Sequence, residues 1–387
     1  MFWPPLSSGS KRGTPGCFPS AVTDGAQLAL LRSAKAIVAL KRFVNAHGAE
    51  IAAWKPELLD SLRRAVREAD LGPASWNPIV GRIQEAAFRS GRPGESELVG
   101  CALLLAEAGL PASWRICPKT PLGVAFAGRW FRCEGSLALV SDGEQLRIDV
   151  DGVTWQFRRS GGQWGADLQA CEAIPGRTMP LVLSSGMSDV QRILHEWPLC
   201  PVEPASSHDI AAVQAALTLL ETHAPEYAAW VRNGAQAVVV IEPSGSMLFG
   251  GSASSRPGLA IVSRAKPIEL ADELVHEATH QYMFTLTILD ELHDGTDRCE
   301  YHSPLRRQLR PFGGILAAYH VICNLVMMYE RITASGYAER AECEAKLEDA
   351  RAALRATDPI VCNNPSLTPL GAMMCRMLRD RVGHVLS

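Results

Sequence analysis

Hydrophobic residues recur at helical spacing through the first hundred positions. Between residues 28 and 66, pairs three, four or seven positions apart recur, among them Leu28 and Leu31, and then Leu58, Leu62 and Val66, which is the spacing of one face of an α-helix. The stretch 95–108 has the same character and stops at Gly109. Gly and Pro residues separate these stretches, which indicates several helices rather than one. We therefore expect a helical N-terminal region over 1–117.

The pattern changes to short alternating runs after residue 118. These runs contain β-branched and aromatic residues, and the steps Asp142-Gly143 and Asp151-Gly152 separate them. An Asp-Gly step between two alternating runs is typical of a β-hairpin. The sequence therefore predicts an antiparallel β region over 118–165.

The second half of the chain opens with a segment, 166–206, in which Gly, Pro and Ser are frequent. We predict that this segment is a linker. After it, short apolar runs predict strands at 237–241 and 258–262, and helical spacing returns afterwards. The expected fold class is α+β: mostly helical, with an antiparallel β region in the middle and a C-terminal helical domain over 207–387.

Composition narrows the class of protein. The chain has 387 residues, 47% hydrophobic and 20% charged, which is typical of a folded protein. A formal net charge of −3 does not provide the basic surface that binds nucleic acid, so we expect no nucleic-acid partner. The eleven cysteines are scattered singly, without a C-x-x-C pair, and the N-terminus has no signal-peptide pattern. Both observations favour a reducing, cytoplasmic location.

One apolar run, 313–329, is at the short limit of length for a membrane span. It contains the polar residues His320 and Asn324, which a lipid environment disfavours. We expect a buried helix over 312–331 and no membrane partner.

The helix that follows the strand predicted at 258–262 contains an H-E-x-x-H motif, formed by His276, Glu277 and His280. Four positions along a helix bring both imidazoles to one face, where they can share a metal ion. The carboxyl group of Glu277 is then close enough to bind a metal-held water without being a ligand. Asp272 and Glu273 precede His276 by one turn, and either could accept its ring N–H. Apolar neighbours indicate a buried metal site rather than two surface histidines.

The motif lacks a third metal ligand, for which the sequence offers His320, Glu300 and His302. His320 lies in the apolar helix, where it could bind a metal or donate to a backbone carbonyl. Glu300 follows the motif at about the distance at which gluzincin peptidases place their third ligand. However, Pro304 disfavours a helix there.

An arginine-rich segment separates the two helices, and it contains Arg306, Arg307 and Arg310. A guanidinium group binds a carboxylate with two parallel hydrogen bonds. An oxygenase needs such a cation for 2-oxoglutarate, whereas a zinc peptidase does not. The alternative is a solvated basic loop.

From Ser206 to Glu330, about a third of its length, the chain resembles the HEXXH-motif proteins of peptide-modification gene clusters, described as 2-oxoglutarate-dependent peptide β-hydroxylases. Besides the helix with the motif, the resemblance rests on an ordered set of segments: Ala224-Pro225-Glu226, 252–255, Pro257-Gly258, Ser263, 301–306, Arg310-Pro311 and 314–316. Two positions depart from the family. Leu305 stands where Trp is usual, and Ala317 stands where a histidine follows a leucine. Because Ala317 cannot bind metal, His320 on nearly the same helical face is the expected replacement.

The resemblance implies a hydroxylase that uses Fe(II) and 2-oxoglutarate to modify a β-carbon of a peptide in the biosynthesis of ribosomal peptide natural products. His276, His280 and His320 would hold the iron, and Arg306 or Arg310 would bind the 2-oxoglutarate. The expected partner is a peptide substrate, with a leader peptide that the N-terminal half could bind.

Two alternatives remain open at the level of sequence. The first is a zinc metallopeptidase, in which Glu277 is the general base and Glu300 or His320 is the third ligand. The second is a non-catalytic binding protein with a structural or decayed metal site, which Ala317 favours.

Overall fold

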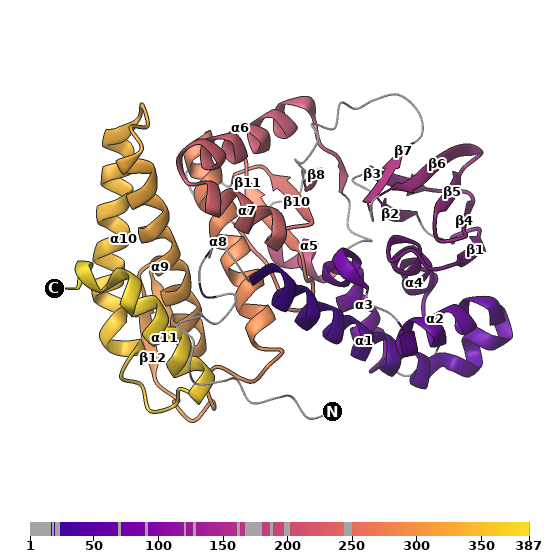
Figure 1. Cartoon of the computed structure of the whole chain (residues 1–387), viewed down its shortest axis with the longest axis horizontal. Coiled ribbons are helices and arrows are strands. Elements are labelled where there is room, and N and C mark those ends of the chain that lie inside the picture. The colour runs from indigo at the N-terminus through magenta and orange to yellow at the C-terminus, as the bar shows by residue number, and fades with distance from the viewer. Residues whose placement is uncertain are drawn as a thin grey trace.

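The structure is a computed structural model that describes residues 17, 19, 24–68, 71–89, 92–119, 121–126, 129–160, 163–166, 180–185, 189–196, 202–243 and 250–386. Both ends of the described chain are helical, and the antiparallel sheets lie in its middle. Figure 1 places the C-terminal helices at one end of the molecule and the large antiparallel sheet at the other. This arrangement confirms the predicted α+β class.

The N-terminal region forms helices, and prolines mark where several of them begin. Pro56 and Pro78 each occupy the first helical position, where the missing N–H costs nothing. The side chain of Asn77 caps the helix that follows it by accepting a hydrogen bond from the backbone N–H of Ile79 at 3.0 Å. The helices are α1 (Asp24–Trp54), α2 (Pro56–Glu68), the short 3₁₀ helix η1 (Gly72–Trp76), α3 (Pro78–Ala86) and α4 (Glu95–Glu107).

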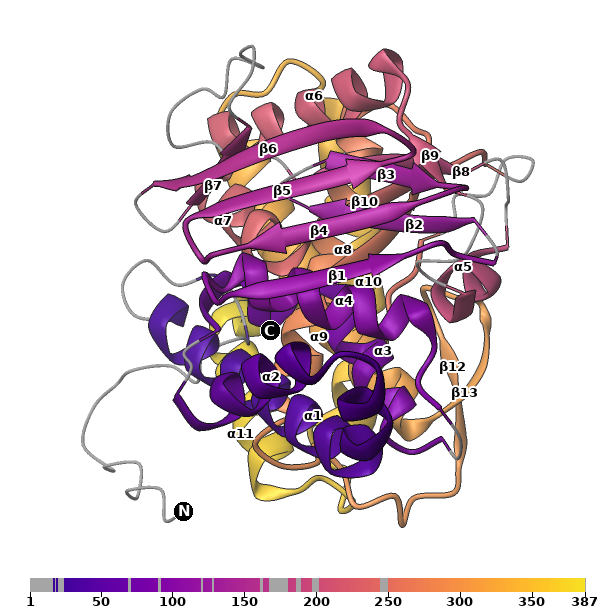
Figure 2. The same ribbon diagram turned by 90° about the vertical axis from the view of Figure 1, so that its right-hand side faces the viewer.

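A five-stranded antiparallel sheet follows, in the order β1-β4-β5-β6-β7, and its long strands lie side by side in Figure 2. Asp151 and Gly152 both have positive φ, 50° and 85°, and close the predicted hairpin between β5 and β6. One continuous core joins this sheet to helices α1–α4. The strands are β1 (Ala112–Ile116), β4 (Leu137–Ser141), β5 (Gln145–Val150), β6 (Val153–Ser160) and β7 (Gln163–Ala166), with β2 (Leu122–Phe126) and β3 (Arg129–Cys133) as a separate antiparallel pair.

The segment predicted as a linker contributes to a second sheet, so that prediction was wrong for its described part. Its strands β8 (Leu181–Ser185) and β9 (Glu203–Pro204) flank α5 (Val190–Glu196), while residues 167–179 lie outside the described residues. β8 pairs in parallel with β10 (Ala237–Ile241), which pairs in parallel with β11 (Leu259–Ser263). Every residue of β10 and β11 is buried, because apolar side chains cover both faces of these strands.

The C-terminal region is a helical layer against this second sheet. Its longest apolar helix, α9, passes the length and composition test for a membrane span, but 78% of its apolar window is buried inside the protein. It is therefore a core helix, as predicted. The elements are α6 (Ser207–His223), α7 (Pro225–Gly234), α8 (Pro267–Leu286), β12 (Glu300–Ser303), β13 (Gln308–Pro311), α9 (Phe312–Ala334), α10 (Arg340–Val361), α11 (Pro369–Val382) and the short η2 (Gly383–Val385).

Candidate metal centre

The H-E-x-x-H motif lies in α8, as its helical spacing predicts. Pro267 starts this helix. Glu269 lies in its first turn, where a negative charge stabilises the helix through its interaction with the helix dipole. His276 and His280 are one turn apart, with ring centroids separated by 4.9 Å and ring planes at 71°. A metal ion about 2.1 Å from a ring nitrogen lies about 3.2 Å from that ring's centroid, so two rings sharing an ion have centroids roughly 4.5–5.2 Å apart. The histidine pair therefore fits a shared metal ion.

Burial keeps both imidazoles in the neutral form that binds metals. It lowers the pKa of His276 to about 4, and the nearby charge of Arg306 contributes to this shift. The pKa of His280 is also well below its ordinary value, first because of burial and then because of His276 and other cationic groups around it. Both rings are consequently unprotonated at neutral pH.

Glu277 lies beside this pair, and its side chain is only 2% exposed. Its Oε1 atom lies 3.9 Å from Nε2 of His276. Burial raises the pKa of this carboxyl group to about 7, an effect that Ser252 and Arg306 partly offset. Within the described part of the chain, Oε2 has no hydrogen-bond partner. A buried carboxyl oxygen without a partner is costly, which indicates that a ligand or water completes this site.

A cavity of about 630 Å³ opens next to the motif and extends along α8 between the β12–β13 hairpin, α9 and α10. His276 and Glu277 line it, and Arg306 from the hairpin lines the same space. The Arg306 side chain donates to the backbone carbonyl of Gly250 at 3.4 Å. The remaining wall is mixed. Apolar residues such as Leu305, Ile322 and Leu325 share it with charged ones: Glu269, Asp272, Glu273, Arg307, Lys346 and Asp349.

The two predicted arginines differ in their surroundings. Arg306 shares the cavity with the motif, whereas the Arg310 side chain packs over the first turn of α9. A methyl group added to Gly314 would come within 3.0 Å of the Arg310 Nε atom. Arg310 still lies close enough to His280 to lower its pKa. Of the two, Arg306 is better placed to bind a ligand in the cavity.

The structure does not bring a third predicted ligand to the histidine pair. Glu300 and His302 are exposed residues of strand β12. His320 is fully buried on α9, and its Nε2 lies 2.7 Å from the backbone carbonyl of Cys17. Among the described residues, no group of three or more His, Cys, Asp or Glu side chains is arranged to hold a metal ion.

The carboxylates predicted to support His276 are engaged elsewhere. Glu273 accepts a hydrogen bond from the backbone N–H of Ser263 at 2.7 Å. Asp272 accepts one from the hydroxyl group of Tyr329 at 2.5 Å and lies 3.9 Å from the ammonium group of Lys346. These two carboxylates join α8 to β11, α9 and α10, so they fix the helix rather than the imidazole.

Two residues of the site were missed in the sequence. Gly250 approaches Glu277 so closely that an added methyl group would lie 2.7 Å from Oε1. Gln281, the residue after the motif, is fully buried and binds the backbone of the segment before β11. In the sequence, the position of Gln281 directly after His280 was the signal that could have indicated its role. No family model matches the chain, and no curated protein matches it either, so we infer its function from the residues of this site.

Proposed function

We propose that the protein is an Fe(II)- and 2-oxoglutarate-dependent hydroxylase of a peptide. The observation that carries the proposal is the shared cavity, in which the Arg306 guanidinium group stands beside His276 and Glu277. A metal ion and a nearby guanidinium group together suit a dicarboxylate such as 2-oxoglutarate, because each can bind one of its ends. The sequence resemblance to peptide β-hydroxylases supports the same assignment.

His276 and His280 would hold the iron, because both are neutral and correctly spaced. The third ligand remains a prediction, with His320, Glu300 and His302 as its candidates. When bound, iron and 2-oxoglutarate supply the oxidising chemistry: one O₂ is consumed, 2-oxoglutarate becomes succinate and CO₂, and a C–H bond of the substrate becomes C–OH.

The residues around His276 and His280 would bind and orient the reactants. Arg306 would donate two hydrogen bonds to the far carboxylate of 2-oxoglutarate, while the carbonyl of Gly250 steadies its side chain. Glu277 would exchange a hydrogen bond with water at the site, through the Oε2 atom that has no partner within the described residues. Leu305 and Ile322 line the same cavity and offer an apolar surface to the substrate.

A short stretch of peptide is a suitable substrate for this cavity. Its volume of about 630 Å³ lies in the usual range for ligand sites, and it is elongated along α8. We place the protein in a reducing cytoplasm, where its free thiols, among them Cys117 and Cys299 at the surface, stay reduced. A leader peptide bound by the N-terminal half completes the proposal.

The decisive experiment uses the full chain, purified without oxygen and loaded with Fe(II). Conversion of 2-oxoglutarate to succinate is measured together with the metal content. We expect iron to bind at one equivalent and 2-oxoglutarate to be consumed slowly even without a peptide. Tight zinc binding without any affinity for 2-oxoglutarate would contradict the proposal.

A zinc metallopeptidase is the second candidate, and the state of Glu277 favours it. A carboxyl group with a pKa of about 7, next to a histidine pair that can bind a metal ion, is suited to be a general base. Glu277→Gln separates the two functions. In a peptidase, this change should lower turnover by about 10²–10⁴-fold, whereas an oxygenase should keep its 2-oxoglutarate turnover within a fewfold. Metal content of the variant is the control, since Glu277 is not a ligand in either case.

A further inference from the structure

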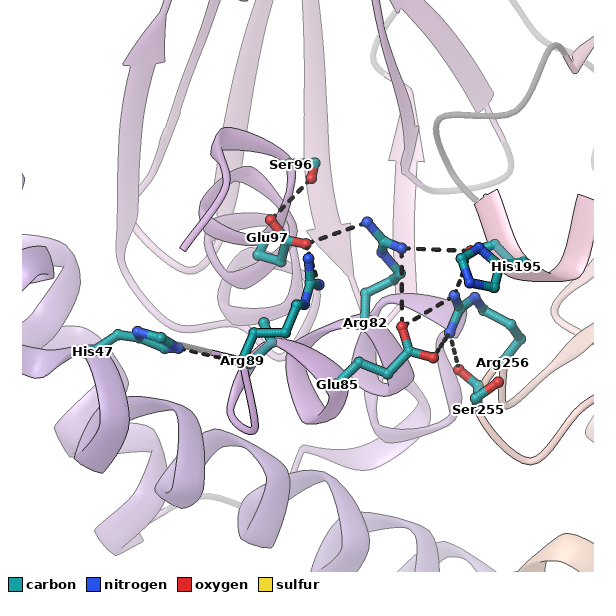
Figure 3. Close-up of polar contacts among 10 residues, drawn as sticks. His47, Arg82, Glu85, Arg89, Ser96, Glu97, His195, Ser255 and Arg256 are labelled. Carbon is teal, nitrogen blue, oxygen red and sulfur yellow. Dashed lines mark hydrogen bonds and ion pairs between the residues drawn. The ribbon is translucent and has the colours of Figure 1, made fainter. Parts of the chain in front are cut away.

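The segment 250–258 lies between the N-terminal helices and the helix that carries the motif. Its residue Arg256 is a buried arginine, 1% exposed. The guanidinium group donates to both carboxylate oxygens of Glu85 on α3, at 2.7 and 3.2 Å, and to the backbone carbonyl of His195 at 2.8 Å. Figure 3 shows Arg256 enclosed by these two partners and by Ser255. Two parallel hydrogen bonds to one carboxylate fix the orientation of the guanidinium plane.

The backbone of the same segment is bound to the motif helix. The side chain of Gln281 donates to the carbonyl of Leu259 at 2.9 Å and to that of Arg256 at 3.4 Å. Its Oε1 atom accepts from the N–H of Gly258 at 2.8 Å. Arg256 therefore joins two elements: its side chain binds α3, and its carbonyl accepts from the residue that follows His280.

The other end of the segment touches the reactive groups. Gly251 exchanges two backbone hydrogen bonds with Ile261 on β11, at 3.0 and 2.9 Å. Next to it, Gly250 lies against the Oε1 atom of Glu277, and its carbonyl accepts from Arg306. A shift of this segment would move the groups that orient both side chains.

Helix α3 is fitted closely to the segment. A methyl group added to Gly81 would lie 1.7 Å from the carbonyl oxygen of Ser255, so only glycine allows this approach. The ion pairs continue into the N-terminal region, where Arg82 and Arg89 both bind Glu97, at 3.3 and 2.9 Å. The network is thus anchored in a second hydrophobic core, separate from that of α8.

From these contacts we propose that Arg256 and Glu85 are a positioning pair, through which the N-terminal helices hold segment 250–258 against Glu277 and Arg306. The pair does not touch the cavity; it acts through the backbone at Gly250. Only one part of this inference rests on the proposed function, namely that Arg306 binds 2-oxoglutarate. It assigns the N-terminal half a part in building the site.

The test compares Glu85→Gln with Arg89→Gln in the full chain. Arg89→Gln is the matched control, since it removes a pair of the same network, Arg89–Glu97, that lies away from the segment. Backbone amide exchange is measured across the molecule, and 2-oxoglutarate affinity is measured on the Fe(II)-loaded protein. For Glu85→Gln we expect exchange about tenfold faster within 250–263 and 2-oxoglutarate binding about tenfold weaker. For Arg89→Gln we expect neither change.

Each outcome decides the inference. Unchanged exchange over 250–263 in Glu85→Gln, or an equal rise in both variants, would overturn it, because a merely structural pair would loosen the protein without preference for this segment. If wild-type protein binds no 2-oxoglutarate, the proposed function fails, and the exchange data still decide whether the pair positions the segment. The milder variant Glu85→Asp keeps the charge and shortens the side chain, and it gives the same comparison if Glu85→Gln does not fold.

Discussion

His320 on α9 donates a hydrogen bond from Nε2 to the backbone carbonyl of Cys17, at 2.7 Å. The same carbonyl accepts a second hydrogen bond, from the side chain of Asn324 at 3.0 Å. All three residues are fully buried. These contacts tie a residue near the N-terminus to the core helix, which gives His320 a structural role.

We therefore predict different effects for changes at His276, His280 and His320. His276→Ala or His280→Ala should lower metal affinity by at least about 100-fold, because each removes one of the paired imidazoles. His320→Ala should change metal affinity less than about threefold but lower the free energy of unfolding by about 2–3 kcal/mol, through a lost buried hydrogen bond and a cavity. Calorimetric titration with Zn²⁺ and denaturant unfolding measure the two quantities. Loss of metal in His320→Ala equal to that in His276→Ala would show that His320 turns toward the ion when it binds.

The second prediction separates Arg306 from Arg310. Arg306→Lys keeps the charge but loses the two-pronged geometry, so 2-oxoglutarate binding should weaken by about tenfold. Arg310→Lys should leave it nearly unchanged, because the Arg310 side chain packs against α9 at Gly314. Equilibrium binding of 2-oxoglutarate to each metal-loaded variant is the measurement. The reverse order would assign the carboxylate to Arg310, and no change in either variant would remove the proposed carboxylate site.

Much of the fold could be predicted because its signals are local. The strand predicted at 237–241 coincides with β10, and the helix with the H-E-x-x-H motif was found from its own periodicity. β8 has the same length as β10, but it was missed because it follows a stretch rich in Gly and Pro. Its stability comes from parallel pairing with β10, more than fifty positions further along the chain, which no local pattern reveals.

The candidate site shows the same limit at the level of side chains. The spacing of His276 and His280 sufficed to predict their pairing, because a helix fixes it. The partner of His320 is 303 positions away, and the partner of Arg256 is 171 positions away. For His320 the sequence allowed both a metal and a carbonyl partner, and only the tertiary fold shows that the carbonyl of Cys17 lies at Nε2. For Arg256 it offered no signal.

The third prediction concerns the close approach of Gly250 to Glu277. In Gly250→Ala the added methyl group would lie 2.7 Å from Oε1 of Glu277, so the carboxyl group must move. Because this is the flexible end of a side chain, the free energy of unfolding should change by less than about 1 kcal/mol. We expect 2-oxoglutarate binding to weaken by about tenfold, because the carbonyl of Gly250 accepts from Arg306 and the displaced carboxyl group lies in the same cavity. Gly383→Ala is the control, because an added methyl group there meets no atom within 4 Å. Unchanged 2-oxoglutarate binding in Gly250→Ala would mean that Gly250 does not hold Arg306 in place.

The last prediction concerns stability and pH, and it involves Glu107 at the end of α4. Burial raises the pKa of this carboxyl group to about 7, although a hydrogen bond from the side chain of Asn77 at 3.2 Å partly offsets the effect. The ordinary pKa of this carboxyl group is 4.5. Between pH 4.5 and about pH 7 the group is therefore protonated in the folded protein and ionised in the unfolded chain. As pH rises through this range, the free energy of unfolding must fall.

Glu107→Gln removes this dependence, because the amide resembles the protonated acid and its oxygen can still accept from Asn77. At pH 8 the variant should be more stable than wild type by about 2 kcal/mol, and at pH 4 the two should be equal. Denaturant unfolding of both proteins at the two pH values measures the difference. Trp164 donates to the backbone carbonyl of Glu107, so that contact is kept in the variant and does not contribute. A stability difference that is the same at pH 4 and pH 8 would show that the carboxyl group is not held protonated, and that Asn77 or water compensates for its burial.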